Sequence, residues 1–133
     1  MVKIVIVDDE AVVFDVLKDM LQKIDNQLKV VGTATSKQDA IEVIKELNPN
    51  LVFIDINMPQ GSGLELLDVF PVRSFETVFI TGYASLEPLA KKYDHIGFVE
   101  KPIELDALKK VITSYRQKSG KASSKIHQNE NLL

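Results

Sequence analysis

The sequence predicts an α/β domain built on a doubly wound, five-stranded parallel sheet. Five apolar segments rich in β-branched residues alternate with segments whose apolar residues recur every three to four positions. Three of the apolar segments, residues 4–7, 51–54 and 78–80, are nearly continuous in apolar character. Strands that helices cover on both faces have this pattern. The chain has 133 residues, enough for one packed core and too few for two.

The elements follow one another in regular order along the chain. Strands are expected at residues 3–7, 28–34, 51–55, 77–81 and 96–100, with helical spacing over 12–24, 40–47 and 105–112. Ser36 and Asp39 predict the N-cap and acidic first turn of the second helix, which Asn48-Pro49 ends. Right-handed crossovers leave few topologies, and the strand order 2-1-3-4-5 suits five strands. In that order the ligand site lies at the carboxyl ends of strands 1 and 3.

Composition excludes several classes of protein. The chain is 45% hydrophobic and 26% charged, which is ordinary for a globular domain. It contains no cysteine, so disulfide frameworks, thiolate metal sites and cysteine nucleophiles are excluded. The first apolar run ends at Asp8, so we expect neither a signal peptide nor a membrane span. We therefore expect the protein to be cytoplasmic.

The charge is unevenly distributed. The formal net charge of −3 divides into −6 over residues 1–115 and +3 over residues 116–133. An acidic body argues against a surface that binds duplex nucleic acid, because such a surface must neutralise phosphates. We therefore expect no nucleic acid to be bound by this chain itself.

Polar residues follow four of the five expected strands. Asp8 and Asp9 follow the first strand, Asp55 ends the third, Thr81 ends the fourth and Lys101 follows the fifth. The first turn has no glycine-rich phosphate loop. Three carboxylates that converge on one pocket repel one another unless a hard cation lies between them. Mg²⁺ fits best, since it takes oxygen ligands and usually recruits a phosphoryl oxygen.

Each of these residues has an ordinary interpretation when it is taken alone. Asp9 or Glu10 alone is usually an N-cap or first-turn acid of a helix. A single aspartate at a strand end is usually a turn residue, and Lys101 before a proline is usually a solvated loop lysine. Their joint position at one edge of one sheet favours a functional site.

Four segments carry a resemblance to a known family. They are IVIVDDE (4–10), LVFIDINMPQGSG (51–63), VFITGYAS (78–85) and FVEKP (98–102). In this order and spacing they resemble the receiver domain of two-component response regulators, whose fold is flavodoxin-like, or CheY-like. The resemblance covers residues 1–116, and residues 117–133 are expected to form a polar linker or tail, with at most a short helix at the last few residues.

The resemblance implies a phosphoacceptor and a metal site. Asp55 matches the aspartate that receives the phosphoryl group. Asp9 matches the main direct carboxylate ligand of Mg²⁺, and Asp8 matches the carboxylate that acts largely through water. Asn57 matches the position that offers a backbone carbonyl to the metal. The implied cofactor is therefore Mg²⁺, with Asp8, Asp9, Asp55 and Asn57 as its ligand set.

The resemblance also implies a catalytic and switching set. Thr81 matches the hydroxyl that binds the phosphoryl group, and Lys101 matches the lysine that pairs with it. The Lys101–Pro102 bond is expected to be cis, as it is in the family. Phe98 matches the aromatic switch residue, whose ring turns inward when Thr81 moves toward the phosphoryl group.

The resemblance implies partners and an output. A histidine kinase would supply the phosphoryl group in a phosphorelay, and the chain would be a phosphoprotein rather than a turnover enzyme, with Mg²⁺-dependent self-phosphorylation and autodephosphorylation. The fourth helix, fifth strand and last helix would form the output face and a possible homodimer contact. Only 19 residues separate Thr81 from Lys101, so the fourth helix should be short, with Pro88 in its first turn. This shortening resembles the receivers of LytTR-type transcription regulators, whose DNA-binding domain this chain lacks.

Two other functions remain open. A stand-alone or degenerate receiver would act as a protein-binding module without phosphate, but it would be expected to lack an acid, the threonine or the lysine. A small Mg²⁺-dependent hydrolase or nuclease could use the same carboxylates. Neither a substrate-binding insertion nor a basic groove accompanies the acids in the sequence.

Overall fold

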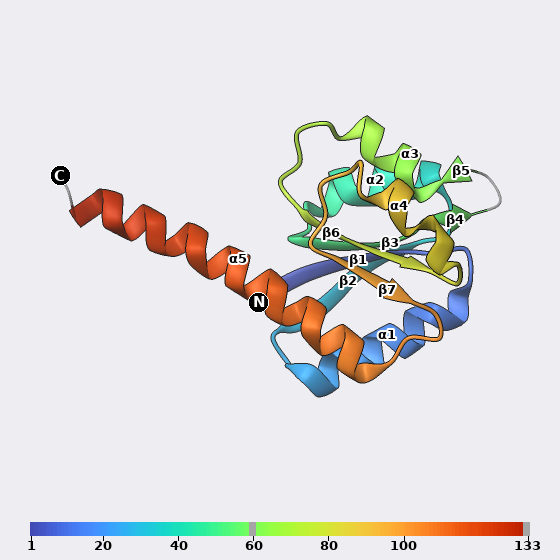
Figure 1. Ribbon diagram of the computed structural model, residues 1–133, viewed down its shortest axis with the longest axis horizontal. Coiled ribbons are helices and arrows are strands. Elements are labelled where there is room, and N and C mark those ends of the chain that lie inside the picture. The colour runs from blue at the N-terminus through green and yellow to red at the C-terminus, as the bar shows by residue number, and fades with distance from the viewer. Residues whose placement is uncertain (59–60, 132–133) are drawn as a thin grey trace.

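Five parallel strands form the central sheet of the computed structural model, which describes residues 1–58 and 61–131 (Figure 1). They are β1 (Val2–Val7), β2 (Leu28–Ala34), β3 (Leu51–Asp55), β6 (Glu76–Thr81) and β7 (Gly97–Glu100). Their order is β2-β1-β3-β6-β7, and every neighbouring pair is parallel. Counted within this sheet alone, the order is the predicted 2-1-3-4-5.

Helices cover both faces of the sheet. They are α1 (Ala11–Ile24), α2 (Lys37–Leu47), α3 (Gly63–Val69), α4 (Glu87–Ala90) and α5 (Leu105–Asn131), with a 3₁₀ turn, η1, at Ala84–Leu86. Helices α1 and α5 pack on one face, and α2, α3 and α4 pack on the other (Figure 1). The doubly wound α/β prediction is confirmed.

Alternation along the strands divides the buried side chains between two cores. Phe53 points toward α1 and α5, whereas Phe79 points toward α2, α3 and α4, and both are fully buried. All four residues of the run 4–7 in β1 are fully buried, two on each face. A sheet packed on both faces holds its strand ends rigidly, which fixes the residues that follow them.

Local signals in the sequence set the helix ends. The Ser36 hydroxyl accepts a hydrogen bond from the Asp39 N–H at 3.2 Å, as the predicted N-cap requires. Asn48 ends α2 in the left-handed region, with a φ of 47°. Ser62 caps α3 by accepting from the Leu64 N–H at 3.1 Å. Helix α4 is a single turn with Pro88 near its start, as predicted.

Two features differ from the sequence prediction. Two-residue strands β4 (Asn57–Met58) and β5 (Gly61–Ser62) pair in an antiparallel fashion beside α3, and a pairing this short leaves no periodic signal. Helix α5 runs for 27 residues to Asn131, where a linker with a short terminal helix was expected; residues 132–133 lie outside the described residues. No proline follows Pro102, so the polar segment can continue the helix.

The far half of α5 extends away from the body of the domain (Figure 1). Its near half is tied to the domain by ion pairs from Arg116 to Asp25 and from Lys118 to Glu76. Although α5 is long, it is polar, and the described part of the chain contains no helix apolar enough to cross a membrane.

Candidate functional site

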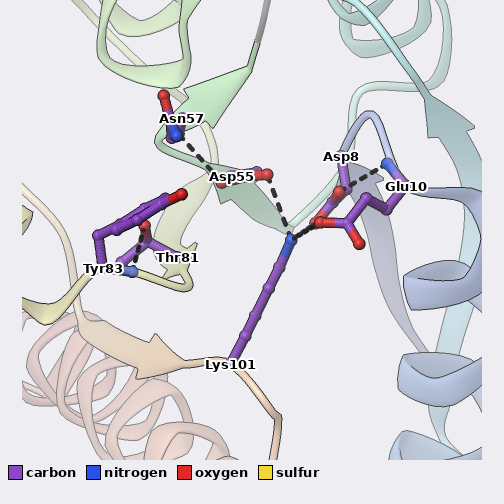
Figure 2. Close-up of polar contacts among 7 residues, drawn as sticks. All are labelled: Asp8, Glu10, Asp55, Asn57, Thr81, Tyr83 and Lys101. Atoms are coloured by element: carbon purple, nitrogen blue, oxygen red, sulfur yellow. Dashed lines mark hydrogen bonds and ion pairs between the residues drawn. The ribbon is translucent and has the colours of Figure 1, made fainter.

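A cavity of about 470 Å³ opens at the carboxyl edge of the sheet, where the sequence predicted a site. It lies over the ends of β1, β3 and β6, and the winding of the sheet reverses between β1 and β3. Its lining consists of Asp9, Glu10, Asp55, Asn57, Gly82, Tyr83 and Lys101. The structure thus brings the predicted residues from separate loops to one place (Figure 2).

Asp55 lies at the floor of this cavity and is 3% exposed. Its Oδ1 accepts a hydrogen bond from the Asn57 N–H at 3.0 Å, and its Oδ2 lies 3.3 Å from the Lys101 Nζ. Burial raises the pKa of Asp55 to about 6, the Asp8 charge adds to this increase, and the Asn57 N–H and Lys101 oppose it. The carboxylate is therefore still largely ionised at pH 7, so it can act as a nucleophile without a general base.

Asp8 and Asp9 follow β1 in different environments. Asp8 is fully buried, and its Oδ1 accepts from the Glu10 N–H at 2.8 Å. Among the described residues, its Oδ2 makes no well-directed hydrogen bond, but it lies 2.9 Å from the Lys101 Nζ. Asp9 is exposed and lines the cavity. Asp8 therefore contributes a buried oxygen that is paired with a lysine, and Asp9 contributes an accessible carboxylate.

These carboxylates fit a magnesium ion. Each of Asp8, Asp9, Glu10 and Asp55 offers an oxygen within 4.8 Å of the oxygens of the others. Hard oxygen donors of this kind are what Mg²⁺ prefers, and one lysine does not neutralise four carboxylates. Asn57 lines the same cavity, and the metal role of its backbone carbonyl stays a prediction.

Lys101 is the basic residue of the site, and three carboxylates surround it. Its Nζ lies 2.9 Å from Asp8 Oδ2, 3.1 Å from Glu10 Oε1 and 3.3 Å from Asp55 Oδ2. Burial acts to lower the pKa of Lys101, but the neighbouring Asp8, Glu10 and Asp55 outweigh burial and raise it above the usual range. The Lys101–Pro102 bond is cis, as expected. The lysine is therefore permanently charged and anchored in the site.

Sequence reasoning missed the position of the Glu10 side chain. Glu10 does occupy the N-cap position of α1, but its side chain makes no capping hydrogen bond within the described residues. It reaches instead across the cavity to Lys101, which is 91 residues away in the chain (Figure 2). The signal was present as the third consecutive acid of the run 8–10.

The two predicted switch residues lie away from the cavity lining. Thr81 is fully buried at the end of β6, and its Oγ1 accepts from the Tyr83 N–H at 3.1 Å (Figure 2). Phe98 is half-buried and packs on the core beneath α2, α3 and α4. Tyr83, which is 58% exposed, forms part of the cavity wall near Thr81. Both switch roles stay predictions.

Comparison with known families decides the identity of this fold and site. A family profile described as "Response regulator receiver domain" matches residues 4–113. The chain belongs to the response regulator receiver family. In the receiver, Asp55, Lys101 and the acidic residues 8–10 lie together at the carboxyl edge of the sheet.

Curated relatives of the receiver include transcriptional regulators. The chain is 32% identical over 135 residues to the transcriptional regulatory protein BtsR of Salmonella typhimurium, covering all of this chain and 56% of that protein. It is 27% identical over 119 residues to the sensory transduction protein LytT of Bacillus cereus, covering 88% of this chain and 48% of that protein. These relatives agree with the resemblance to LytTR-type regulators. The receiver spans about half the length of the curated relatives it matches.

Solved structures support the fold. The receiver domain of AraT, a response regulator from Geobacillus stearothermophilus, superposes with a TM-score of 0.81 at 23% identity, covering 92% of this chain and 98% of that one. A CheY-like receiver domain from Methylobacillus flagellatus gives 0.74 at 24% identity, covering 86% of this chain and 98% of that one. The CheY-like fold class is confirmed.

Proposed function

We propose that the receiver accepts a phosphoryl group on Asp55 from the phosphohistidine of a histidine kinase, or from a small acyl phosphate, in Mg²⁺-dependent signalling. One observation carries the proposal: Asp55 is buried at the cavity floor within 3.3 Å of the Lys101 ammonium and within 4.8 Å of other carboxylate oxygens. This arrangement suits the transfer of a highly charged group to a carboxylate.

The proposed transfer is a single displacement at phosphorus. A carboxylate oxygen of Asp55 forms the new P–O bond, while the P–N bond of phosphohistidine, or the P–O bond of an acyl phosphate, breaks and its electron pair leaves with the donor. Lys101 pairs with one phosphoryl oxygen, and the Thr81 hydroxyl donates to another. Asp9 and Asp55, with Asp8 through water and the Asn57 carbonyl, would hold the Mg²⁺, which neutralises charge on the transferring group.

Phosphorylation would then be transmitted by a small rearrangement. Thr81 turns toward the phosphoryl group, and the Phe98 ring turns inward to fill the space that Thr81 leaves. The surface of α4, β7 and α5 changes with them and serves as the output face, with homodimerisation as one use of it. The packing of Phe98, half-buried rather than locked in the core, supports such a movement.

The proposed output is transcription, through a DNA-binding domain. Its relatives BtsR, about twice as long, and LytT support this assignment. A further relative, 29% identical, is a protein-glutamate methylesterase/protein-glutamine glutaminase from Clostridium acetobutylicum, of which the chain covers 40%. The receiver itself is proposed to be a cytoplasmic phosphoacceptor without substrate turnover.

Intact-mass measurement tests the proposal. With Mg²⁺ and acetyl phosphate, wild-type protein should gain one phosphoryl group, and Asp55→Asn should gain none while its circular dichroism spectrum stays unchanged. Asp15→Asn, which removes an exposed carboxylate from α1, is the matched control and should be phosphorylated normally. An unmodified wild type would contradict the proposal. Phosphoester or nucleic-acid hydrolysis that survives in Asp55→Ala would favour a hydrolase instead.

A further inference from the structure

We propose that Glu10 is a positioning residue that holds Lys101 in the unphosphorylated receiver and must release it before the lysine can bind a phosphoryl oxygen. The inference rests on the proposed phosphorylation of Asp55 and adds a competing contact within the same site. Removal of the Glu10 charge should therefore make the site more receptive to a phosphoryl group.

The ammonium group of Lys101 is crowded by carboxylates. A lysine ammonium has three protons to donate. Three carboxylate oxygens, from Asp8, Glu10 and Asp55, already lie within 3.3 Å of Nζ. A phosphoryl oxygen that approaches Lys101 must therefore displace one of these contacts.

The three carboxylates around Lys101 differ in how easily they can leave it. Asp8 is fully buried, and its other oxygen is held by the Glu10 N–H at 2.8 Å, so its carboxylate cannot easily withdraw. Asp55 is the acceptor itself and stays beside the incoming group. The Glu10 side chain is 57% exposed, so it can rotate into solvent at little cost in desolvation. Glu10 is therefore the partner that leaves.

The mouth of the cavity carries an excess of negative charge. Four carboxylates and one lysine face each other here, and any phosphoryl donor adds negative charge. Asp9 and Asp55 match metal ligands of the family, and the fully buried Asp8 pairs with Lys101. The contribution of Glu10 to the resting site is its contact with Lys101 and its repulsion of an anion.

Beryllofluoride, an anionic analogue of a phosphoryl group, provides the test. Its binding to Glu10→Gln at saturating Mg²⁺ is followed by amide NMR shifts, beside wild type and Asp15→Asn. Glutamine keeps the size of the side chain but removes its charge. The half-saturating beryllofluoride concentration should fall about two- to five-fold in Glu10→Gln, which is the range for a partly exposed ion pair. Asp15→Asn removes one negative charge from an exposed position of α1. Its half-saturating beryllofluoride concentration should change less than that of Glu10→Gln.

Titration with Mg²⁺ alone separates positioning from metal binding. If Glu10 positions Lys101, Glu10→Gln should keep most of its Mg²⁺ affinity, whereas Asp9→Asn should lose it several-fold. A several-fold loss of Mg²⁺ affinity would make Glu10 a metal ligand and overturn the inference. Unchanged or weaker beryllofluoride binding in Glu10→Gln would overturn it as well. A wild type that binds no beryllofluoride would overturn the proposed function itself, which is a distinguishable result.

Discussion

The two ends of the central sheet differ in how far the chain itself pairs and neutralises their polar groups. At the amino end, the Lys3 N–H donates to Asn50 Oδ1 at 2.8 Å, and the Asn50 N–H donates back to the Lys3 carbonyl at 2.8 Å. Glu76, at the start of β6, pairs with Lys118 of α5 at 2.9 Å. These groups find their partners within the chain.

The carboxyl end is organised around groups that the chain does not fully neutralise. Lys101 faces three carboxylates, Asp9 adds a fourth to the same cluster, and the pKa of Asp55 is raised to about 6. The strands beneath are as well packed as those at the other end. The core therefore supplies rigidity, while the unneutralised charge at the carboxyl end supplies the capacity to bind a cation and a phosphoryl group.

Among these substitutions, Gly63→Ala at the carboxyl end should have the largest effect on the free energy of unfolding. A Cβ at this position would lie 2.1 Å from the Asp55 carbonyl oxygen, and backbone cannot rotate away as a side chain can. Gly63→Ala should therefore lower the free energy of unfolding by about 3 kcal/mol or more, at the upper end for overpacking. Urea denaturation measures this change.

Gly82 is the matched control for that substitution. It lines the same cavity, but a Cβ there has no described atom within 4 Å. Gly82→Ala should stay within about 0.5 kcal/mol of wild type. Equal effects at Gly63 and Gly82 would contradict the close approach of Gly63 to the phosphoacceptor backbone.

Asp55→Asn should reveal the next largest effect through its pH dependence. The folded pKa of about 6 lies above the unfolded value, so the unfolded state ionises first as pH rises. Asp55 therefore costs stability progressively between about pH 4 and pH 6, and the cost remains above that range. In Mg²⁺-free buffer, Asp55→Asn should match wild type near pH 4 and be more stable by about 2–3 kcal/mol at pH 7. A stability difference independent of pH would refute this account of Asp55.

Lys118→Met should have the smallest effect, because it changes the amino end. The Lys118–Glu76 pair is partly exposed, with side chains 47% and 31% accessible. Its loss should change the unfolding free energy by less than about 1 kcal/mol. Phosphorylation of Asp55 should be unaffected, and a clear loss of phosphorylation would show that the two ends are coupled through β6.

The sequence predicted most of the fold because its signals are local. The run 51–55 gave the bounds of β3 without error, and Ser36 and Asn48 marked the ends of α2. Features that depend on distant partners or run against local signals were missed. The β4–β5 pairing is only two residues long, and α5 continues through Gly120, a residue type that more often ends a helix.

The candidate site was predicted as a set of residues but not as a set of contacts. Strand-end position and family resemblance were enough to assemble Asp8, Asp9, Asp55 and Lys101. The contact between Glu10 and Lys101 spans 91 residues and depends on how α1 begins relative to β7. Helix-capping preference suggested a different role for Glu10, and the tertiary attraction of the lysine outweighed it.

Magnesium-linked stability tests the central claim most directly, namely that the carboxyl end is completed by a cation. Unfolding of wild type and Asp9→Asn is measured at pH 7 over a Mg²⁺ titration. Wild type should gain about 1.4 kcal/mol when Mg²⁺ reaches ten times its dissociation constant, and Asp9→Asn should gain far less at that concentration. A wild-type stability that does not respond to Mg²⁺, or an equal gain in both proteins, would contradict the account.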